Sequence, residues 1–406
     1  MSLPTLGESL SSLFAEAADG GREISGRLRA AGLDGLTAER ALALTALIAP
    51  RPAVTGMLAA LGIPPEAAAE LTESLIRDGY LERRAAPGGQ SRVGATGQGV
   101  AVADAVLTGL MAARWAGLPL RPDDIVISSW PKSGTTWLQM ICALLVFQVP
   151  ELPAPLGELS PWPEELSLAR DEIGARLAAQ RHRRFIKSHL PLGAIPADPK
   201  VSYLVIARHP LDAAISAYFE QRNIAPPHHG AASGHHTPGP PGPAPSREPP
   251  APPGPAPQRP APVGDAPHDW LLRWLDGPEL PRMLSHLTDA WDRRAEPNVV
   301  LLHYHDLCAD LDGQMRRLAA YLDIAVPEST WPGLVQAAGF EQMRAAADQL
   351  APDRTFKSKA GFFRRGTPGS GRELLSPAEL ARYDRRAAQL APPGLLAWLH
   401  HDDRPG

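Results

Sequence analysis

The sequence predicts an α/β protein: a three-layer domain with a central parallel sheet, preceded by a small, mostly helical domain. Beyond Leu118, short apolar segments alternate with helical patterns, as is typical of parallel sheets whose strands are joined by helices. One segment, Val201–Ala207, is apolar on both faces, which suits a strand buried between two layers of helices. Before Leu118, apolar residues recur at helical spacing. We therefore divide the chain into domains 1–111 and 112–400.

Composition narrows the function classes. The 406 residues are 44% hydrophobic and carry a formal net charge of −4, which argues against a protein built to coat nucleic acid. The two cysteines, Cys142 and Cys308, form neither a disulfide framework nor a zinc motif. No basic start precedes an apolar run at the N-terminus, and Trp137–Phe147 is too short to span a bilayer. We expect a soluble, cytoplasmic protein without a membrane partner.

The N-terminal pattern predicts helices followed by a hairpin. The segment Glu66–Asp78 has one apolar face, Gly79 ends it, and Tyr80–Arg84 begins a strand before the turn at 87–89. The runs LTAERALALTALI, LTESLIRDGYLERR and GATGQGVAVADAV carry this order over Leu36–Val106. The pattern resembles a winged helix of the MarR type.

Binding to DNA is nevertheless unlikely on electrostatic grounds. A recognition helix must offer cations to phosphates, but the helix in question carries four acids, Glu66, Glu70, Glu73 and Asp78, against Arg77 alone. We expect this domain to serve docking or dimerisation, so that a homodimer through the N-terminal domain is possible.

Strands and helices alternate through the rest of the chain, and ligands bind such sheets at the carboxyl ends of the strands. A proline- and glycine-rich run at 225–267 interrupts this order and predicts a disordered insertion in a loop. The expected strands are Ile125–Ser128, Phe185–Lys187, Val201–Ala207 and Val299–Tyr304, and the expected helices begin near Thr135 or span Leu211–Asn223, Leu280–Ala295 and Asp310–Leu322.

The turn after the first strand is the sharpest functional signal. It reads WPKSGTTW, Trp130 to Trp137. Gly134 lets the backbone approach an anion, and the helix that follows presents free N–H groups and a positive dipole end. Lys132 adds a mobile charge, while Thr135 and Thr136 add hydroxyl donors. The lysine precedes the glycine, so the run is not a nucleotide-triphosphate P-loop, and a phosphotransferase is disfavoured.

A candidate base ends the second strand. Lys187 and His189 are two residues apart and so point to one face. An imidazole that titrates near neutrality can deprotonate a hydroxyl. The alternative is a structural histidine that is buried in the core with its hydrogen bonds made there.

Two further segments predict an anion site. Arg208 ends the third strand, and Ser216 lies eight residues later on the following helix, so both can converge on one anion. Arg364, Arg365 and Gly366 form a basic turn that can close over the same group. The alternatives are a structural arginine and a solvated charged face.

These segments together resemble the cytosolic sulfotransferases that use 3′-phosphoadenosine 5′-phosphosulfate (PAPS). The resemblance spans about 112–366, outside the insertion. The matching runs are RPDDIVISSWPKSGTTW, FIKSHLPL, ARHPLDAAISAYF, HLTDAWDRRAEPNVVLLHYHDL, GFEQMR and FFRRG.

The resemblance implies a P-loop-like sulfotransferase fold, PAPS as co-substrate, a small-molecule acceptor and no metal. It assigns catalysis to His189 as base and to Lys132 and Lys187 as charge stabilisers. Trp162 and Tyr218 would line the acceptor pocket. The cofactor-binding residues would be Lys132, Ser133, Gly134, Thr135, Thr136, Trp137, Arg208, Ser216, Tyr304, Phe340, Arg364, Arg365 and Gly366.

Two hypotheses follow. The first is an enzyme that transfers a sulfuryl group from PAPS to a hydroxyl, or to an amine, of a small molecule. The second is a transcriptional regulator that uses a sulfotransferase-like domain as a nucleotide sensor. The chain departs from the family's usual GDWK-like run at Thr367–Arg372, and Ala338–Gly339 replaces the usual hydroxyl-bearing pair before Phe340.

Overall fold

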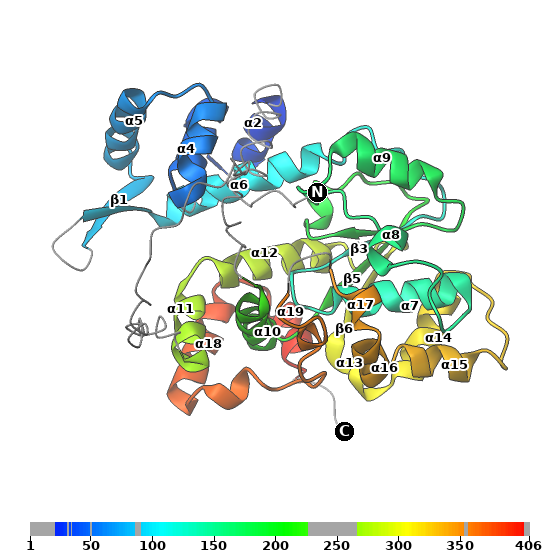
Figure 1. The fold of residues 1–406 in the computed structure, drawn as a ribbon. Coiled ribbons are helices and arrows are strands. Elements are labelled where there is room, and N and C mark those ends of the chain that lie inside the picture. Colours follow the sequence, from blue (N-terminus) through cyan, green and yellow to red (C-terminus); the bar gives the residue numbers. More distant parts are fainter. Residues whose placement is uncertain are drawn as a thin grey trace, which may run out of the picture.

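The computed structural model describes residues 21–30, 32–33, 35–48, 51–85, 91–225, 266–352 and 356–401. Most of the predicted insertion, 226–265, therefore lies outside the described residues. The N-terminal region contains helices and one two-stranded antiparallel sheet (Figure 1). Its elements are α2 (Gly21–Ala30), α3 (Ala38–Ile48), α4 (Arg51–Ala60), α5 (Pro65–Arg77), β1 (Leu81–Ala85), β2 (Ser91–Ala95) and α6 (Gly97–Ala113).

The larger domain is built on a four-stranded parallel sheet in the order β4-β3-β5-β6. This confirms the predicted α/β class and parallel sheet. The strands are β3 (Ile125–Ser128), β4 (Phe185–Ser188), β5 (Ser202–Ala207) and β6 (Val299–His303). The helices are α7 (Thr135–Phe147), α8 (Leu156–Leu159), α9 (Arg170–Ala179), α10 (Pro210–Asn223), α11 (Pro267–Asp276), α12 (Glu279–Asp292), α13 (Tyr304–Ala309), α14 (Leu311–Tyr321), α15 (Trp331–Ala337), α16 (Phe340–Ala345), α17 (Ala347–Leu350), α18 (Pro377–Ala388) and α19 (Pro393–His400), with 3-10 turns at Leu192–Ala194, Ala360–Phe362 and Arg372–Leu374.

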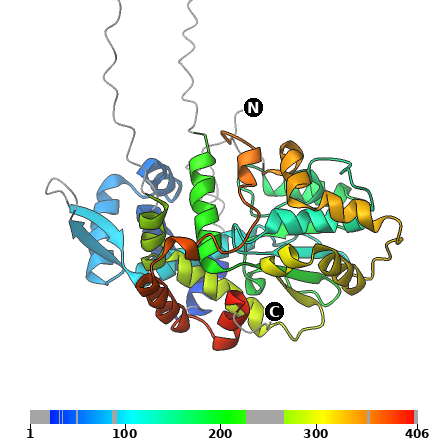
Figure 2. The same ribbon diagram turned by 90° about the horizontal axis from the view of Figure 1, so that it is seen from below.

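Helices cover both faces of the sheet, and the strands feed two separate cores. Ile125 and Ile127 of β3 pack with α7, α14 and α15 on one face, whereas Val126 packs with α10, α12 and α19 on the other. This alternation follows from the opposite directions of successive side chains on a strand. Figures 1 and 2 show the two helical layers and place the N-terminal elements, in blue and cyan, beside them.

Several boundaries differ from the prediction by one to three residues, and three points bear on the site or on how the domains join. Tyr304 begins α13 instead of ending β6, because the His303 imidazole accepts from the backbone N–H of His305 and caps the helix. Helix α11 begins at Pro267, inside the predicted insertion, because proline fits the first turn of a helix. The domain boundary at 111/112 falls within α6, which runs unbroken to Ala113.

In the described part of the chain, no helix combines the length and apolarity needed to cross a bilayer.

A buried histidine should make stability depend on pH. His286 of α12 is 4% exposed, and burial lowers its pKa from 6.5 to about 4. The folded protein therefore keeps His286 neutral down to about pH 4, whereas the unfolded chain takes up a proton near pH 6.5. We expect the free energy of unfolding to fall by about 3 kcal/mol as pH drops across that window. Urea unfolding at several pH values measures this, and His286→Gln should flatten the profile; an unchanged slope would contradict it.

Candidate active site

The loop between β3 and α7 has the backbone of an anion cradle. Gly134 precedes the helix with φ 115°, in the region that favours glycine. A Cβ at this position would come within 2.8 Å of the Ile206 side chain and 3.0 Å of the Tyr304 ring. Gly134 thus permits both the turn and the close approach of β5 and α13. The first N–H groups of α7 consequently face a cavity at the carboxyl end of the sheet.

This cavity has a volume of about 420 Å³, within the usual range of ligand pockets of about 300–1,000 Å³. Two buried polar atoms beside it, Ser133 Oγ and Arg208 Nε, have no hydrogen-bond partner among the described residues. Buried polar groups are normally satisfied, so each orphan calls for an explanation. An anion in the cavity would supply an acceptor for Arg208 Nε, which lies 3.9 Å from the Asp212 carboxylate. The residues present therefore fit a phosphorylated ligand.

Lys132 lies in the same loop and is held inside the cavity. Its ammonium makes an ion pair of 3.0 Å with Glu220 of α10 and lies 4.0 Å from the centre of the Phe362 ring. The side chain is 9% exposed, so the charge acts in a largely dehydrated environment. Sequence reasoning missed Glu220, although it lies four residues after Ser216 and thus on the same helix face.

The orientation of His189 defines its basic atom. Nδ1 lies 2.8 Å from the carbonyl oxygen of Ser129, at the end of β3. A carbonyl oxygen only accepts, so Nδ1 donates and the neutral imidazole keeps its lone pair on Nε2. The ring stands edge-on to Trp162 at a centroid distance of 5.3 Å. The Lys187 ammonium lies over the same indole, 4.1 Å from the ring centre. The predicted base and lysine thus share one aromatic neighbour.

A buried carboxylate holds this group in place. Glu164 accepts from the Ser188 hydroxyl at 2.6 Å, the Trp115 indole at 2.6 Å and the His189 backbone N–H at 3.3 Å. It also accepts from the Trp162 indole. Burial raises its pKa, and these hydrogen bonds oppose that rise. Nothing in the sequence near Glu164 indicated this role, because three of its partners, Trp115, Ser188 and His189, come from two distant segments.

Removing the Glu164 carboxylate should destabilise the fold and also disturb the orientation of His189. Glu164→Ala leaves several buried donors without an acceptor, so we expect a loss of at least about 2 kcal/mol in the free energy of unfolding. Chemical denaturation measures this loss. The conservative Glu164→Gln keeps an acceptor oxygen and should lose less. Equal stability of Glu164→Ala and the unmodified protein would contradict the role of the network.

Aromatic side chains form a second wall of the cavity. Trp137 stands edge-on to Tyr304 at 5.2 Å, and its indole donates to the carbonyl of Ala338. Phe340 packs against Gly366, where a Cβ would lie 2.4 Å from the ring. Burial raises the pKa of Tyr304 to about 12, so its hydroxyl remains protonated. Flat apolar surfaces of this kind suit a nucleobase.

Three arginines gather near Tyr304. The Arg208 guanidinium lies 4.2 Å from the Tyr304 ring centre. Burial, with Arg365 and Arg208 nearby, lowers the pKa of Arg364. The segment 367–372, which follows Arg364 and Arg365 and departs from the family pattern, is fixed to α10: Asp212 accepts from the N–H groups of Gly369 and Gly371, each at 2.7 Å.

The structure brings most of the predicted residues together. Ser133 is buried in the loop itself, and Tyr218 lines neither this cavity nor the larger cleft described below; it packs against Phe219 and Trp270. Phe362, Phe363 and Met343 line the cavity without having been predicted. The predicted residues that line it are Lys132, Gly134, Thr135, Thr136, Trp137, Trp162, Lys187, His189, Arg208, Ser216, Tyr304, Phe340, Arg364, Arg365 and Gly366.

The fold and this site define a sulfotransferase. A sulfotransferase domain model matches residues 122–391. The chain is 38% identical over 317 residues to a glycolipid sulfotransferase of Mycobacterium bovis, covering 72% of this chain and 92% of the relative, and equally to one of Mycobacterium tuberculosis. It is 25% identical to sulfotransferase 1A1 of Canis lupus familiaris, over 65% of this chain and 82% of the relative. The chain belongs to the sulfotransferase domain family, which confirms the predicted class.

Solved structures give more distant likenesses. Retinol dehydratase in complex with retinol and PAP has a TM-score of 0.49 and 17% identity, covering 80% of this chain and 93% of that one. A mouse sulfotransferase complexed with PAP has a TM-score of 0.47 and 19% identity, covering 68% and 86%.

Proposed function

We propose that this protein transfers a sulfuryl group from PAPS to a hydroxyl of a small-molecule acceptor. The observation that carries the proposal is that Lys132, His189 and Arg208, whose Nε is buried without a hydrogen-bond partner, line one cavity. PAPS, when bound, would supply the sulfuryl group: the bond from sulfur to the phosphate oxygen breaks as the acceptor oxygen bonds to sulfur, and PAP is the leaving group. The residues of the protein would bind the co-substrate, stabilise the developing charge and accept the proton of the acceptor.

Binding falls to the loop and the arginines. The N–H groups at the start of α7, Ser133 and Lys132 would hold the 5′-phosphosulfate. Arg208, Ser216, Arg364 and Gly366 would hold the 3′-phosphate, and Trp137, Tyr304 and Phe340 would enclose the adenosine. No metal is required, because a sulfuryl group carries less negative charge than a phosphoryl group and cationic side chains can stabilise it.

Proton transfer falls to His189. Its Nε2 takes the acceptor proton, while the Ser129 carbonyl holds Nδ1–H and stabilises the resulting imidazolium. Lys132 and Lys187 stabilise the charge that develops during transfer.

The relatives suggest an acceptor class. Because the chain covers 92% of a relative named a glycolipid sulfotransferase at 38% identity, we propose a glycolipid hydroxyl as the acceptor.

We further propose that the N-terminal region is a winged-helix module without DNA-binding function. The order of α3, α5, the β1–β2 hairpin and α6 supports the first part. The pairing of its cations supports the second: Arg83 with Glu73, and Arg84 with Glu82. These partners weaken attraction to phosphates, which disfavours the regulator hypothesis. A homodimer through this region stays a prediction.

Calorimetry with PAP tests the donor site directly. We expect binding in the micromolar range, about −8 kcal/mol. Arg208→Ala should weaken PAP by about 10- to 100-fold, since a charge-assisted hydrogen bond contributes about 1.5–3 kcal/mol. It should leave adenosine 5′-phosphosulfate, which lacks the 3′-phosphate, nearly unaffected. Absence of heat from PAP on folded protein would refute the proposed function.

A further inference from the structure

We infer that the cleft between the N-terminal region and the α/β domain is the acceptor site, and that it takes an elongated amphipathic alcohol. The inference deepens the proposed function and rests on it. The observation behind it is that His189 lines two hollows at once: the donor cavity and a cleft of about 1870 Å³.

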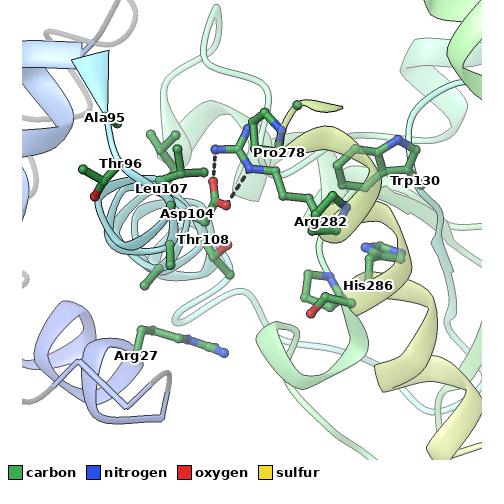
Figure 3. Close-up of a pocket in the computed structure, with 18 of the residues that line it drawn as sticks. Arg27, Ala95, Thr96, Asp104, Leu107, Thr108, Trp130, Pro278, Arg282 and His286 are labelled. Carbon is green, nitrogen blue, oxygen red and sulfur yellow. Dashed lines mark hydrogen bonds and ion pairs between the residues drawn. The ribbon is translucent and has the colours of Figure 1, made fainter. Parts of the chain in front are cut away.

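The cleft has walls from both domains. Val100, Asp104, Leu107 and Thr108 of α6 form the N-terminal wall, together with Arg27 of α2. Trp130, His286 and Arg282 face them from the α/β domain, as Figure 3 shows. A hydroxyl bound at the His189 end of this cleft would lie next to the one side chain named above that also lines the donor cavity. An acceptor bound there is therefore contacted by residues outside the sulfotransferase match, which begins at residue 122.

Direct contacts fix one wall relative to the other. Asp104 pairs with Arg282 across the cleft (Figure 3). The Arg27 guanidinium donates to the carbonyl of Gly193 at 3.1 Å, four residues after His189. At the end of α6, buried Arg114 donates to the carbonyls of Pro163 and Leu168, each at 2.7 Å. The cleft is thus a defined site whose shape the N-terminal region sets.

The lining selects the class of ligand. Its volume exceeds the usual range of about 300–1,000 Å³, so a simple phenol would leave most of it empty. Leu47, Val54 and Val93 of the N-terminal region add apolar side chains to the lining, with Val93 exposed. Polar groups such as Thr108 and Ser285 offer hydrogen bonds to hydroxyls. An alkyl chain with a hydroxylated head group matches both surfaces.

A matched pair of variants tests the inference. Ala101 is exposed and lines the cleft on α6, whereas Ala69 is exposed on α5 outside it. Ala101→Trp places a large ring in the cleft, and Ala69→Trp adds the same ring elsewhere. The probe is octyl β-glucoside below its critical micelle concentration, titrated by calorimetry with PAP present. We expect Ala101→Trp to raise its Kd at least about tenfold, or about 1.4 kcal/mol, and Ala69→Trp to leave it unchanged.

Sulfuryl transfer from labelled PAPS provides a second readout. Ala101→Trp should raise the KM for octyl β-glucoside and leave PAP affinity near the unmodified value, whereas Ala69→Trp should leave the KM values for octyl β-glucoside and 2-naphthol unchanged. Absence of octyl glucoside binding, or equal binding by both variants, overturns the cleft as acceptor site. The proposed function has its own readout, because loss of PAP binding and of transfer to 2-naphthol in the unmodified protein would refute it whatever the cleft binds.

Discussion

His189→Ala should reduce kcat for sulfuryl transfer by about 10²- to 10⁴-fold, the usual contribution of a positioned general base. The reason lies in the geometry of the imidazole. The Ser129 carbonyl, 2.8 Å from Nδ1, leaves Nε2 as the basic atom beside both the donor cavity and the cleft. Alanine removes that atom and keeps the backbone N–H that donates to Glu164.

The measurement separates chemistry from binding. Initial rates with labelled PAPS give kcat, and calorimetry gives the Kd of PAP, which should change little because His189 holds a proton and not a phosphate. His268→Ala is the matched control, since His268 is half-exposed on α11 and lies outside both hollows. Wild-type kcat in His189→Ala would exclude it as the base.

Lys132→Ala should also cost about 10²- to 10³-fold in kcat, the range seen when one preorganised charge-stabilising group is lost. The ammonium is 9% exposed and next to Glu220. Its removal takes away a cation and leaves the carboxylate facing the donor, so PAP affinity should fall as well.

A double variant resolves these two contributions. Lys132→Ala with Glu220→Ala removes the repulsive carboxylate and should recover PAP affinity while kcat stays low. Lys200→Ala, an exposed lysine outside the cavity, controls for the loss of one positive charge. If Lys132→Ala keeps kcat within about threefold, a role in stabilising the transition state is ruled out.

Local patterns predicted the parts of the site that lie on one segment. The loop from Trp130 to Trp137 combines a glycine turn, hydroxyls and a helix start within eight residues, and the structure forms that cradle. The strand before it was predictable because a parallel strand buried on both faces is continuously apolar. His189 directly follows β4, and the short apolar run of that strand made its position predictable in the same way.

Groups whose role depends on distant partners could not be predicted. Glu164 acquires its importance from Trp115, Ser188 and His189, which only folding brings together. The acceptor role of Tyr218, which only the family resemblance implies, stays a prediction; its side chain packs against Phe219 and Trp270. The cleft is lined by residues of both the N-terminal region and the α/β domain, so no single sequence segment predicts it.

The unbroken run of α6 into Arg114 has a practical consequence for how this protein can be cut or grafted. A gene fragment that starts at residue 112, where the sequence alone suggested a border, would begin inside the last helical turn before Arg114 and Trp115, with the anchoring residues left on a frayed end. The segment that holds His189 would then lose the support of Trp115, which donates to Glu164, together with the N-terminal region. Helix α6 thus joins the N-terminal region to the segment around Glu164 that positions His189. A displacement of the N-terminal region would therefore also displace His189.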